Sequence, residues 1–386
     1  MTEEFEFYSP VRISSGTGKA FHMDEWMKRF HAYHMLIITG KRIGKSEVFR
    51  MFTEKLNEQG VDFEIYDRAV PEPSVEAVDT LAEYVRAHDF DLVTAVGGGS
   101  SMDTAKAVCM LKNNSGSIRE YLFGGSRLPE KTSIPLICIP TTAGSGSEVS
   151  AASVIADTQK QVKLSCTSAL LLPKAAILDP LMQTDMPSEI TAGTGMDAMT
   201  HAIEAYTSRN ANTFSDLYAR RAIELISEYL PMVMDKPEDL HGRMMMAQAS
   251  TMAAVAFLNG GLGAVHGISQ AMGGIAHTPH GISNAILLPY VMDCNCSGNL
   301  NKFADIASFM GDREKNLSLE EKAHRAVELV RTLNHRIGIP DHIATLGVSR
   351  GMFPAIIKGT MEYRMLKLNP VEMTESIVGR ILEESF

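Results

Sequence analysis

The stretch Asp91-Leu-Val-Thr-Ala-Val-Gly-Gly-Gly-Ser-Ser-Met-Asp103 decides the fold class of this chain. Residues 91–96 form a short apolar run that is typical of a buried strand, and residues 102–111 have helical spacing. Three glycines and two serines join the two segments. A strand that passes through a glycine-rich turn into a helix is typical of a parallel α/β sheet. We therefore expect an α/β domain around this stretch.

The neighbouring segments repeat the alternation of strand and helix. Strand patterns cover residues 35–39, 62–66 and 133–139, and helical patterns cover residues 46–59 and 74–88. Parallel strands place the loops that follow them at one edge of the sheet, where ligands bind. The glycine-rich loop is therefore expected at a ligand-binding edge.

The pattern changes after Asp179-Pro180, where strand signals become scarce. Long helical periods replace them, over residues 187–209, 214–229, 244–258 and 318–336. We expect an α/β dinucleotide-binding domain over residues 1–183 and an all-helical metal and substrate domain over residues 184–386. A chain of 386 residues is also too long for one ordinary core, so two domains are expected on length alone.

Composition excludes several classes of function. The net charge is −10 and no long run of Lys or Arg occurs, which argues against a nucleic-acid or anionic-membrane partner. No apolar stretch approaches the roughly 20 residues of a membrane span. The acidic N-terminal residues lack a signal-peptide core, and the five cysteines are scattered and odd in number. These features predict a cytoplasmic protein with reduced thiols.

The loop from Gly97 to Ser101 suits a pyrophosphate, because glycines let the backbone approach a ligand and a helix N-terminus offers free N–H groups. It is not the GxGxxG fingerprint. A plain capped helix start, with Ser100 as N-cap and Asp103 three residues later, is the alternative. A second loop from Pro140 to Glu148 has two threonines and two glycines, and it could contact ribose, phosphate or nicotinamide.

A second notable stretch begins at His266 and holds three of the twelve histidines within fifteen residues. Gly273-Gly274 is expected to loosen or end one helix. Thr278 and Pro279 have the residue types of an N-cap and a first helical position. His266 would then lie on the first helix and His280 in the first turn of the second. Two imidazoles on a helix–turn–helix can point at one spot, although each could equally be a core histidine bonded to carbonyls.

Asp197 and His201 stand four residues apart in a helical segment, so both side chains lie on one face. A simple hydrogen bond between them is the alternative to a shared metal. With His266 and His280 the set becomes one carboxylate and three imidazoles. Such a set suits Fe²⁺, Zn²⁺, Co²⁺ or Mn²⁺, and an open position on the ion would bind a substrate oxygen.

Five motifs in chain order resemble those of the iron-containing (group III) alcohol dehydrogenases. They are Gly97-Gly-Gly-Ser-x-x-Asp103, Pro140-Thr-Thr-x-Gly-Ser-x-x-Glu148, Ala176-Ile-Leu-Asp-Pro180, Gly195-x-Asp197-x-x-x-His201-x-Ile-Glu-x-Tyr206, and the segment His266 to Pro279-His280-Gly281. The likeness covers the whole chain, and the motifs are jointly specific. It implies an N-terminal α/β nucleotide domain and a C-terminal helical domain, the fold shared with glycerol dehydrogenase and dehydroquinate synthase.

The resemblance also implies roles for individual residues. The implied metal ligands are Asp197, His201, His266 and His280. The implied cofactor-binding positions are Gly97, Gly98, Gly99, Ser100, Asp103, Thr141 and Thr142, with Lys163 at the ribose. Phe257 falls where relatives line the substrate pocket. The implied cofactors are NADP or NAD together with Fe²⁺, with Zn²⁺ as the alternative ion.

Two positions depart from the pattern of the family. Many members carry a proton-transferring histidine four residues after the third ligand, whereas this chain has Gln270, which cannot exchange a proton at neutral pH. We expect His277 to serve as the catalytic proton relay, with bound water or the cofactor ribose as alternatives. At the end of the first strand, Gly40-Lys41-Arg42 replaces the Asp that would repel a 2′-phosphate, which favours NADP. Lys41 and Arg42 could also be plain solvated cations.

The expected function is the reversible transfer of hydride between a small alcohol and its aldehyde or ketone, by a metal-dependent, NAD(P)-linked dehydrogenase. A dehydroquinate-synthase-like lyase or a glycerol-dehydrogenase-like enzyme is the alternative within the same fold. The lyase needs several cationic side chains for an acidic substrate, but residues 257–265 and 282–291 are mostly apolar. A non-catalytic metal or nucleotide binder is a third possibility. Relatives suggest a homo-oligomer, a dimer or larger.

Overall fold

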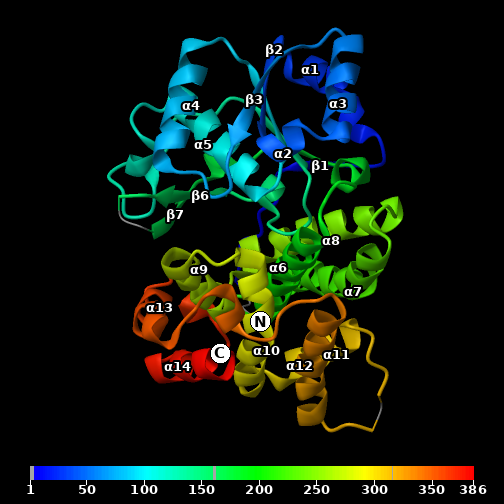
Figure 1. Cartoon of the computed structure of the whole chain (residues 1–386), viewed down its shortest axis with the longest axis vertical. Coiled ribbons are helices and arrows are strands. Elements are labelled where there is room, and N and C mark those ends of the chain that lie inside the picture. Colours follow the sequence, from blue (N-terminus) through cyan, green and yellow to red (C-terminus); the bar gives the residue numbers. More distant parts are fainter. Residues whose placement is uncertain (1–3, 160–161, 315) are drawn as a thin grey trace. The chain divides into compact units, whose positions relative to one another are not determined.

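The computed structural model describes residues 4–159, 162–314 and 316–386. Contacts within the chain divide it into an α/β unit and a helical unit (Figure 1). The α/β unit contains Ser9–Thr142 and Gly146–Met186. The helical unit contains Pro187–Phe386, residues 143–145, and an N-terminal piece that ends at Tyr8. The helical unit thus includes two segments that lie far from it in sequence.

A parallel sheet forms the centre of the α/β unit. Its strands are β1 (Arg12–Ser15), β2 (His34–Gly40), β3 (Asp62–Ala69), β4 (Leu92–Gly97), β5 (Leu136–Pro140) and β8 (Ala175–Leu178). They lie in the order β1-β8-β5-β4-β2-β3, and every neighbouring pair is parallel. The expected α/β class is therefore confirmed, and Gly97 pairs with Pro140 at the carboxyl edge, where the two predicted loops begin.

Helices cover both faces of this sheet. They are α1 (Met23–Phe30), α2 (Lys41–Gly44), α3 (Glu47–Glu58), α4 (Val75–Ala87) and α5 (Gly99–Asn113). Alternate residues of β2 point to opposite sides: Leu36 and Ile38 pack with α4 and α5, while Met35 and Ile37 pack with α1 and α3. This alternation explains why the strand is apolar throughout. A separate antiparallel hairpin consists of β6 (Ala152–Asp157) and β7 (Val162–Thr167).

The second unit is built from helices around one large apolar core. They are α6 (Ser188–Thr207), α7 (Thr213–Asp235), α8 (Leu240–Gly260), α9 (Ala264–Ala276), α10 (His280–Asn295), α11 (Leu300–Phe309), α12 (Leu319–Arg336), α13 (Phe353–Met361) and α14 (Glu375–Glu384). The expected all-helical C-terminal part is confirmed. The five cysteines are free, and four of them are buried.

Two local expectations and one alternative were wrong. Helix α5 begins at Gly99 with Gly98 as its N-cap, so Ser100 does not cap it. Helix α9 continues through Gly273-Gly274 and stops at Ala276, because His277 adopts the left-handed conformation that ends it (φ 53°). Pro279, with extended backbone, is the N-cap of α10, so the helix starts one residue later than the Thr278–Pro279 pattern predicts.

No single helix within the described residues is both long and apolar enough to cross a membrane. One bent pair, Leu240–Gly260 with Ala264–Ala276, meets that test only when the two helices are combined across a 103° bend.

Candidate metal centre and cofactor loops

Helix α6 places Asp197 and His201 one turn apart, and both are buried, at 6% and 5% exposure. Helix α10 approaches α6 closely at its first turn. A Cβ at Gly281 would lie 2.4 Å from the carbonyl oxygen of Gly193, so only glycine fits there. This close approach brings His280, the first residue of α10, to the carboxylate of Asp197.

Three imidazole nitrogens converge on one carboxylate oxygen. The Oδ1 atom of Asp197 lies 3.8 Å from His201 Nε2, 3.7 Å from His266 Nε2 and 3.6 Å from His280 Nε2. The ligand atoms of Asp197, His201 and His266 all lie within 4.8 Å of one another. The rings also pack together. The ring centroids of His201 and His266 are 4.7 Å apart, and the two ring planes are inclined by only 17°.

These distances fit a shared divalent ion. Ligand atoms about 2.1 Å from one ion lie roughly 3.4 Å apart in a tetrahedral arrangement. The observed separations of 3.6–3.8 Å are close to that value and longer than a direct hydrogen bond. One carboxylate with three imidazoles also suits Fe²⁺ or Zn²⁺ chemically. The four side chains could therefore hold such an ion.

Glu204 orients His266, and sequence reasoning assigned it no role. Its Oε2 accepts from His266 Nδ1 at 2.6 Å, which leaves Nε2 as the imidazole atom that faces Asp197. Its Oε1 accepts from the backbone N–H of Val265 at 2.7 Å, in the first turn of α9. Glu204 stands three residues after His201 on the same helix, and this same-face spacing was the signal that could have identified it.

Asn284 is the second polar residue that the motifs missed. It is fully buried on α10, one turn after His280, and its Nδ2 donates to Asp197 Oδ1 at 2.7 Å. The same nitrogen lies 3.2 Å from His280 Nε2 and 3.3 Å from His266 Nε2. Here too a helical spacing of four residues was the available signal.

Burial and charge push the pKa values of the cluster in different directions. Burial alone would raise the pKa of Asp197, but the surrounding imidazoles outweigh it and hold that pKa well below its usual range. Burial lowers the pKa of His201 to about 4, against the attraction of Asp197. Burial also opposes the protonation of His266, yet Glu204 and Asp197 raise its pKa to about 9. Asp197 is therefore anionic and His201 neutral near pH 7, which are the forms that bind metal.

Phe257 lies against the metal cluster, whereas His277 is exposed to solvent. The ring of Phe257 is half-buried, with its centroid 4.6 Å from that of His201. His277 is exposed at the end of α9, and Gln270 is exposed on the same helix. Phe257 thus adjoins the cluster directly, whereas His277 stands in solvent beyond the C-terminus of α9.

The expected cofactor loops lie side by side at the carboxyl edge of the parallel sheet. The backbone N–H of Thr141 donates to Gly97 O at 3.0 Å, and a Cβ at Gly98 would lie 3.2 Å from Thr142 Oγ1. Gly40 ends β2 beside the glycine-rich turn, since a Cβ there would lie 3.9 Å from Ser101 Oγ. The first turn of α5, which includes Gly99 and Ser100, opens at the same edge.

Asp103 and Lys163 are engaged by the protein itself. Asp103 Oδ1 accepts from Ser147 Oγ at 2.6 Å and Oδ2 from the N–H of Val154 at 2.9 Å, so this carboxylate joins α5 to the hairpin. Lys163 on β7 pairs with Glu72 at 2.5 Å. The N–H of Glu72 in turn donates to Ser100 Oγ at 3.3 Å, which links Lys163 to the glycine-rich loop.

Lys41 and Arg42 form the start of the short helix α2, and both are exposed. The guanidinium of Arg42 donates to Asp185 O at 3.0 Å. Arg42 is therefore held to another segment of the α/β unit, while its charge stays near the end of β2.

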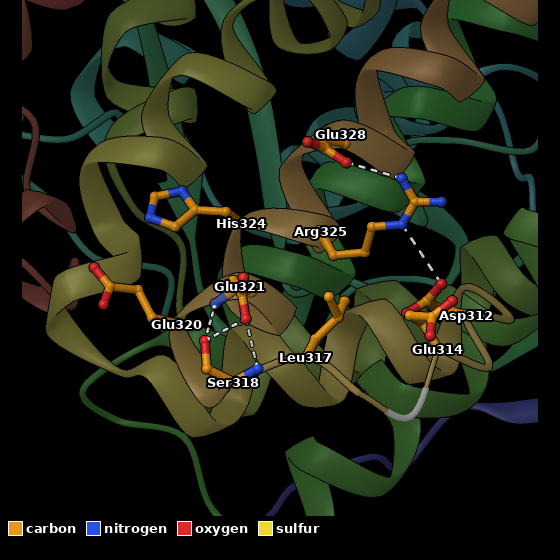
Figure 2. A pocket seen from close by; sticks show the side chains of 9 residues that line it. All are labelled: Asp312, Glu314, Leu317, Ser318, Glu320, Glu321, His324, Arg325 and Glu328. Carbon is orange, nitrogen blue, oxygen red and sulfur yellow. Dashed lines mark hydrogen bonds and ion pairs between the residues drawn. The ribbon is translucent and has the colours of Figure 1, made fainter.

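One hollow of the helical unit is lined by none of the residues of the metal cluster. It measures about 720 Å³ and is formed by α12 and the residues before it. Figure 2 shows Arg325 between Asp312 and Glu328, and it forms ion pairs with both. Ser318 is the N-cap of α12, and the Glu321 carboxylate accepts from the backbone N–H of Ser318 in the same capping box.

Comparison with known proteins covers both units. The family model "Iron-containing alcohol dehydrogenase" matches residues 10–180, and the model of the "Fe-containing alcohol dehydrogenase family, C-terminal" matches residues 191–386. An NAD-dependent methanol dehydrogenase of Bacillus methanolicus is 34% identical, over 98% of this chain and 99% of its own length. A lactaldehyde reductase of Escherichia coli K12 is 36% identical, over 94% and 95%.

Solved structures agree with these matches. The crystal structure of a 1,3-propanediol oxidoreductase superposes with a TM-score of 0.95 at 33% identity and covers both chains fully. The chain therefore belongs to the iron-containing alcohol dehydrogenase family, as an oxidoreductase that acts on CH–OH groups.

Proposed function

We propose that this enzyme oxidises a small, uncharged alcohol to its aldehyde or ketone, reversibly, with NADP as the preferred hydride acceptor and Fe²⁺ as its ion. The observation that carries the proposal is the convergence of three imidazole nitrogens on one oxygen of Asp197. In the forward direction one hydride moves to the nicotinamide, and one proton leaves the alcohol oxygen.

Asp197, His201, His266 and His280 would hold the ion, with Zn²⁺ as the alternative. When bound, a divalent ion at such a site supplies Lewis acidity, which lowers the pKa of an alcohol oxygen. Glu204 keeps His266 oriented by accepting its Nδ1 hydrogen. Phe257, in contact with His201, would form an apolar wall for the substrate. These roles belong to residues 184–386, and the cofactor roles belong to residues 1–183.

The α/β unit would position the dinucleotide. The backbone N–H groups of Gly98, Gly99 and Ser100 at the start of α5 suit the pyrophosphate, because a helix N-terminus favours a negative charge. Thr141 and Thr142 would contact the cofactor from the adjoining loop, and Lys163 would approach the ribose beside Ser100. Asp103 would act through the loop that it anchors.

The preference for NADP rests on Gly40-Lys41-Arg42. The small residue at the end of β2 leaves room for a 2′-phosphate, and two exposed cations follow it. We expect Lys41→Ala/Arg42→Ala to raise the KM for NADP about 10-fold or more while it leaves the KM for NAD nearly unchanged. Equal changes in KM for NADP and NAD would show that Lys41 and Arg42 do not bind the 2′-phosphate.

The route of the released proton is the least constrained part of the mechanism. His277 is the nearest substitute in sequence for the histidine that Gln270 replaces. We expect His277→Ala to lower kcat and to change its dependence on pH, and Gln270→His to restore part of the loss. Full activity of His277→Ala across the pH range would leave water or the ribose as the route.

The names of similar proteins refer to alcohols and aldehydes of different sizes. They refer to methanol, lactaldehyde and 1,3-propanediol, and a relative from Geobacillus thermodenitrificans is called a long-chain-alcohol dehydrogenase. Together with Phe257, the apolar residues around the ligands favour a small alcohol or aldehyde. We also propose a cytoplasmic homo-oligomer, a dimer or larger, which analytical ultracentrifugation would test.

The deciding experiment measures metal content and turnover together. Purified enzyme is loaded with Fe²⁺ or Zn²⁺ and assayed with NADP and NAD against a panel of alcohols and aldehydes. Net production of NADPH or NADH supports a dehydrogenase. It excludes a lyase that reduces its bound cofactor only transiently and reoxidises it within each turnover. Metal-loaded enzyme without cofactor-linked turnover on any member of the panel would contradict the proposal.

A further inference from the structure

Asn284 has no role in any motif of the sequence, yet its amide lies among the metal-ligand atoms. The residue is fully buried, and its Nδ2 is 2.7 Å from Asp197 Oδ1. Two imidazole nitrogens, of His280 and His266, lie at 3.2 and 3.3 Å from the same atom. One amide nitrogen thus faces three atoms that would bind an ion.

An imidazole Nε2 cannot accept a hydrogen bond from the Asn284 amide and bind a cation at the same time. A side-chain amide nitrogen has two hydrogens, and a neutral imidazole Nε2 has one lone pair. That lone pair can accept a hydrogen from Asn284 or bind a cation, but not both. An ion held by His280 therefore competes with the amide N–H groups for the lone pair on its Nε2.

The other end of the amide lacks a partner. Asn284 Oδ1 is buried and accepts no hydrogen bond from any described residue. A half-turn about the terminal side-chain bond exchanges the positions of oxygen and nitrogen, because the amide group is planar. The turned oxygen would then face Asp197 Oδ1, which is repulsive unless a cation lies nearby. Binding of a cation would reverse the balance between the two orientations.

We propose that Asn284 is a further group of the metal centre, which turns its amide oxygen toward a bound divalent cation and thereby sets the affinity and coordination of the site. This inference rests on the proposed function, because it needs an ion held by Asp197 and the three histidines. The amide donates to Asp197 in one orientation and faces the cation in the other.

The added oxygen has a consequence for ion preference. One carboxylate and three imidazoles suit a four-coordinate ion such as Zn²⁺. An amide oxygen adds a hard donor, which suits Fe²⁺ and Mn²⁺ with higher coordination numbers. Asn284 would thus help the site to favour Fe²⁺ over Zn²⁺.

The test compares the full-length wild type with Asn284→Leu, which has similar volume and no polar atom. Dissociation constants for Co²⁺, Fe²⁺ and Zn²⁺ are measured by chelator competition without oxygen, and the visible spectrum of the Co²⁺ form is recorded. We expect Asn284→Leu to weaken Co²⁺ and Fe²⁺ about 10-fold to 100-fold, and Zn²⁺ less. Its Co²⁺ bands should become stronger, as four-coordinate Co²⁺ absorbs more intensely than five-coordinate Co²⁺.

An unchanged Co²⁺ spectrum in Asn284→Leu would overturn the inference even if affinity fell, because a residue that only holds Asp197 does not enter the coordination sphere. Asn284→Asp keeps an oxygen and should retain the wild-type spectrum. If the leucine variant does not fold, a Co²⁺ affinity of Asn284→Asp below that of the wild type overturns the inference instead.

Asn295→Leu is the matched control, since Asn295 is buried on the same helix but pairs with Asn369. It should leave Co²⁺ affinity and spectrum unchanged. A wild-type enzyme that binds none of the three ions would contradict the proposed function itself. If the wild type and Asn284→Leu have the same ion affinities and the same Co²⁺ spectrum, only the role of Asn284 is contradicted.

Discussion

Glu204 performs two tasks at the metal cluster with its two carboxylate oxygens. One oxygen accepts from His266 and the other from the N–H of Val265. The first contact selects the imidazole nitrogen that faces Asp197. The second places a negative charge at the positive end of α9. A single side chain therefore couples the position of a helix to the orientation of one of its residues.

Replacing Glu204 with Gln is predicted to weaken the binding of a divalent ion by about 10-fold to 100-fold, because a neutral amide supports the His266 imidazole less well. Isothermal titration with Zn²⁺ or Co²⁺ measures the effect. Glu189→Gln is the control, since Glu189 is exposed in the first turn of the same helix. If both variants bind the ion equally well, Glu204 has no part in orienting the ligand.

Lys106 is a fully buried cation beneath the second loop. Its Nζ donates to Ser147 Oγ, Ser150 Oγ and Ala152 O at 2.7–2.9 Å. Burial lowers the pKa of Lys106, although the nearby Asp103 opposes that shift. Lys106→Met is predicted to reduce the free energy of unfolding by about 3 kcal/mol, because it leaves the Asp103 carboxylate without its cation.

Chemical denaturation of two further variants separates charge from packing at this site. Asp103→Leu/Lys106→Met should recover part of the stability, since no buried charge remains. Lys112→Met, on the same helix, removes two hydrogen bonds to backbone carbonyls but no buried ion pair. A loss of only about 1 kcal/mol is expected there. An equal loss for Lys106→Met would refute the argument from charge.

At the scale of elements, the junction of β4 and α5 depends on glycine. A Cβ at Gly97 would lie 2.5 Å from Ser101 Oγ and 2.7 Å from Ser101 Cβ. Gly97→Ala is therefore predicted to shift the first turn of α5, at a cost of about 1–3 kcal/mol. The displaced N–H groups should raise the Kd of NADP about 10-fold or more.

Fluorescence titration with NADPH tests this loop directly. Gly379→Ala on α14 is a suitable control, because the added Cβ meets Ile357 Cδ1 at an ordinary 3.6 Å. Alanine in that helix should leave the affinity unchanged and raise stability slightly. An unaltered Kd for Gly97→Ala would mean that the glycine-rich turn does not hold the pyrophosphate.

At the scale of the whole molecule, the proposed ligands act on different units. Ion binding involves helices α6, α9 and α10, and cofactor binding involves β4, β5 and α5. Because a ligand stabilises what it binds, each should protect its own unit from hydrogen exchange. Removing the ion with a chelator is predicted to speed exchange in residues 188–207 and 264–295. NADP should slow it in residues 92–113.

Mass spectrometry of peptides from the exchanged protein measures both effects in one experiment. The Asp197→Ala variant provides the control for the chelator, because its helical unit should no longer respond. Faster exchange in the α/β unit on chelation, with none in the helical unit, would contradict the division of roles.

Sequence patterns located most elements because their signals are local. The apolar runs that became β2 and β4 are buried on both faces, and the helical periods of α6 and α12 are continuous over several turns. The hairpin of β6 and β7 was missed, because half-buried strands such as Val162–Thr167 carry a weak pattern. The end of α9 was misplaced because His277, not glycine, takes the left-handed position.

The sequence by itself determined the α/β and helical halves, the family, and the helical face shared by Asp197 and His201, since periodicity and motif spacing are properties of the chain. The tertiary structure alone decided what surrounds that face. It brought His266 and His280 to Asp197 through the close approach at Gly281, and it turned Glu204 and Asn284 inward. Asp103 likewise faces the hairpin, because contacts between distant segments depend on packing that no local pattern encodes.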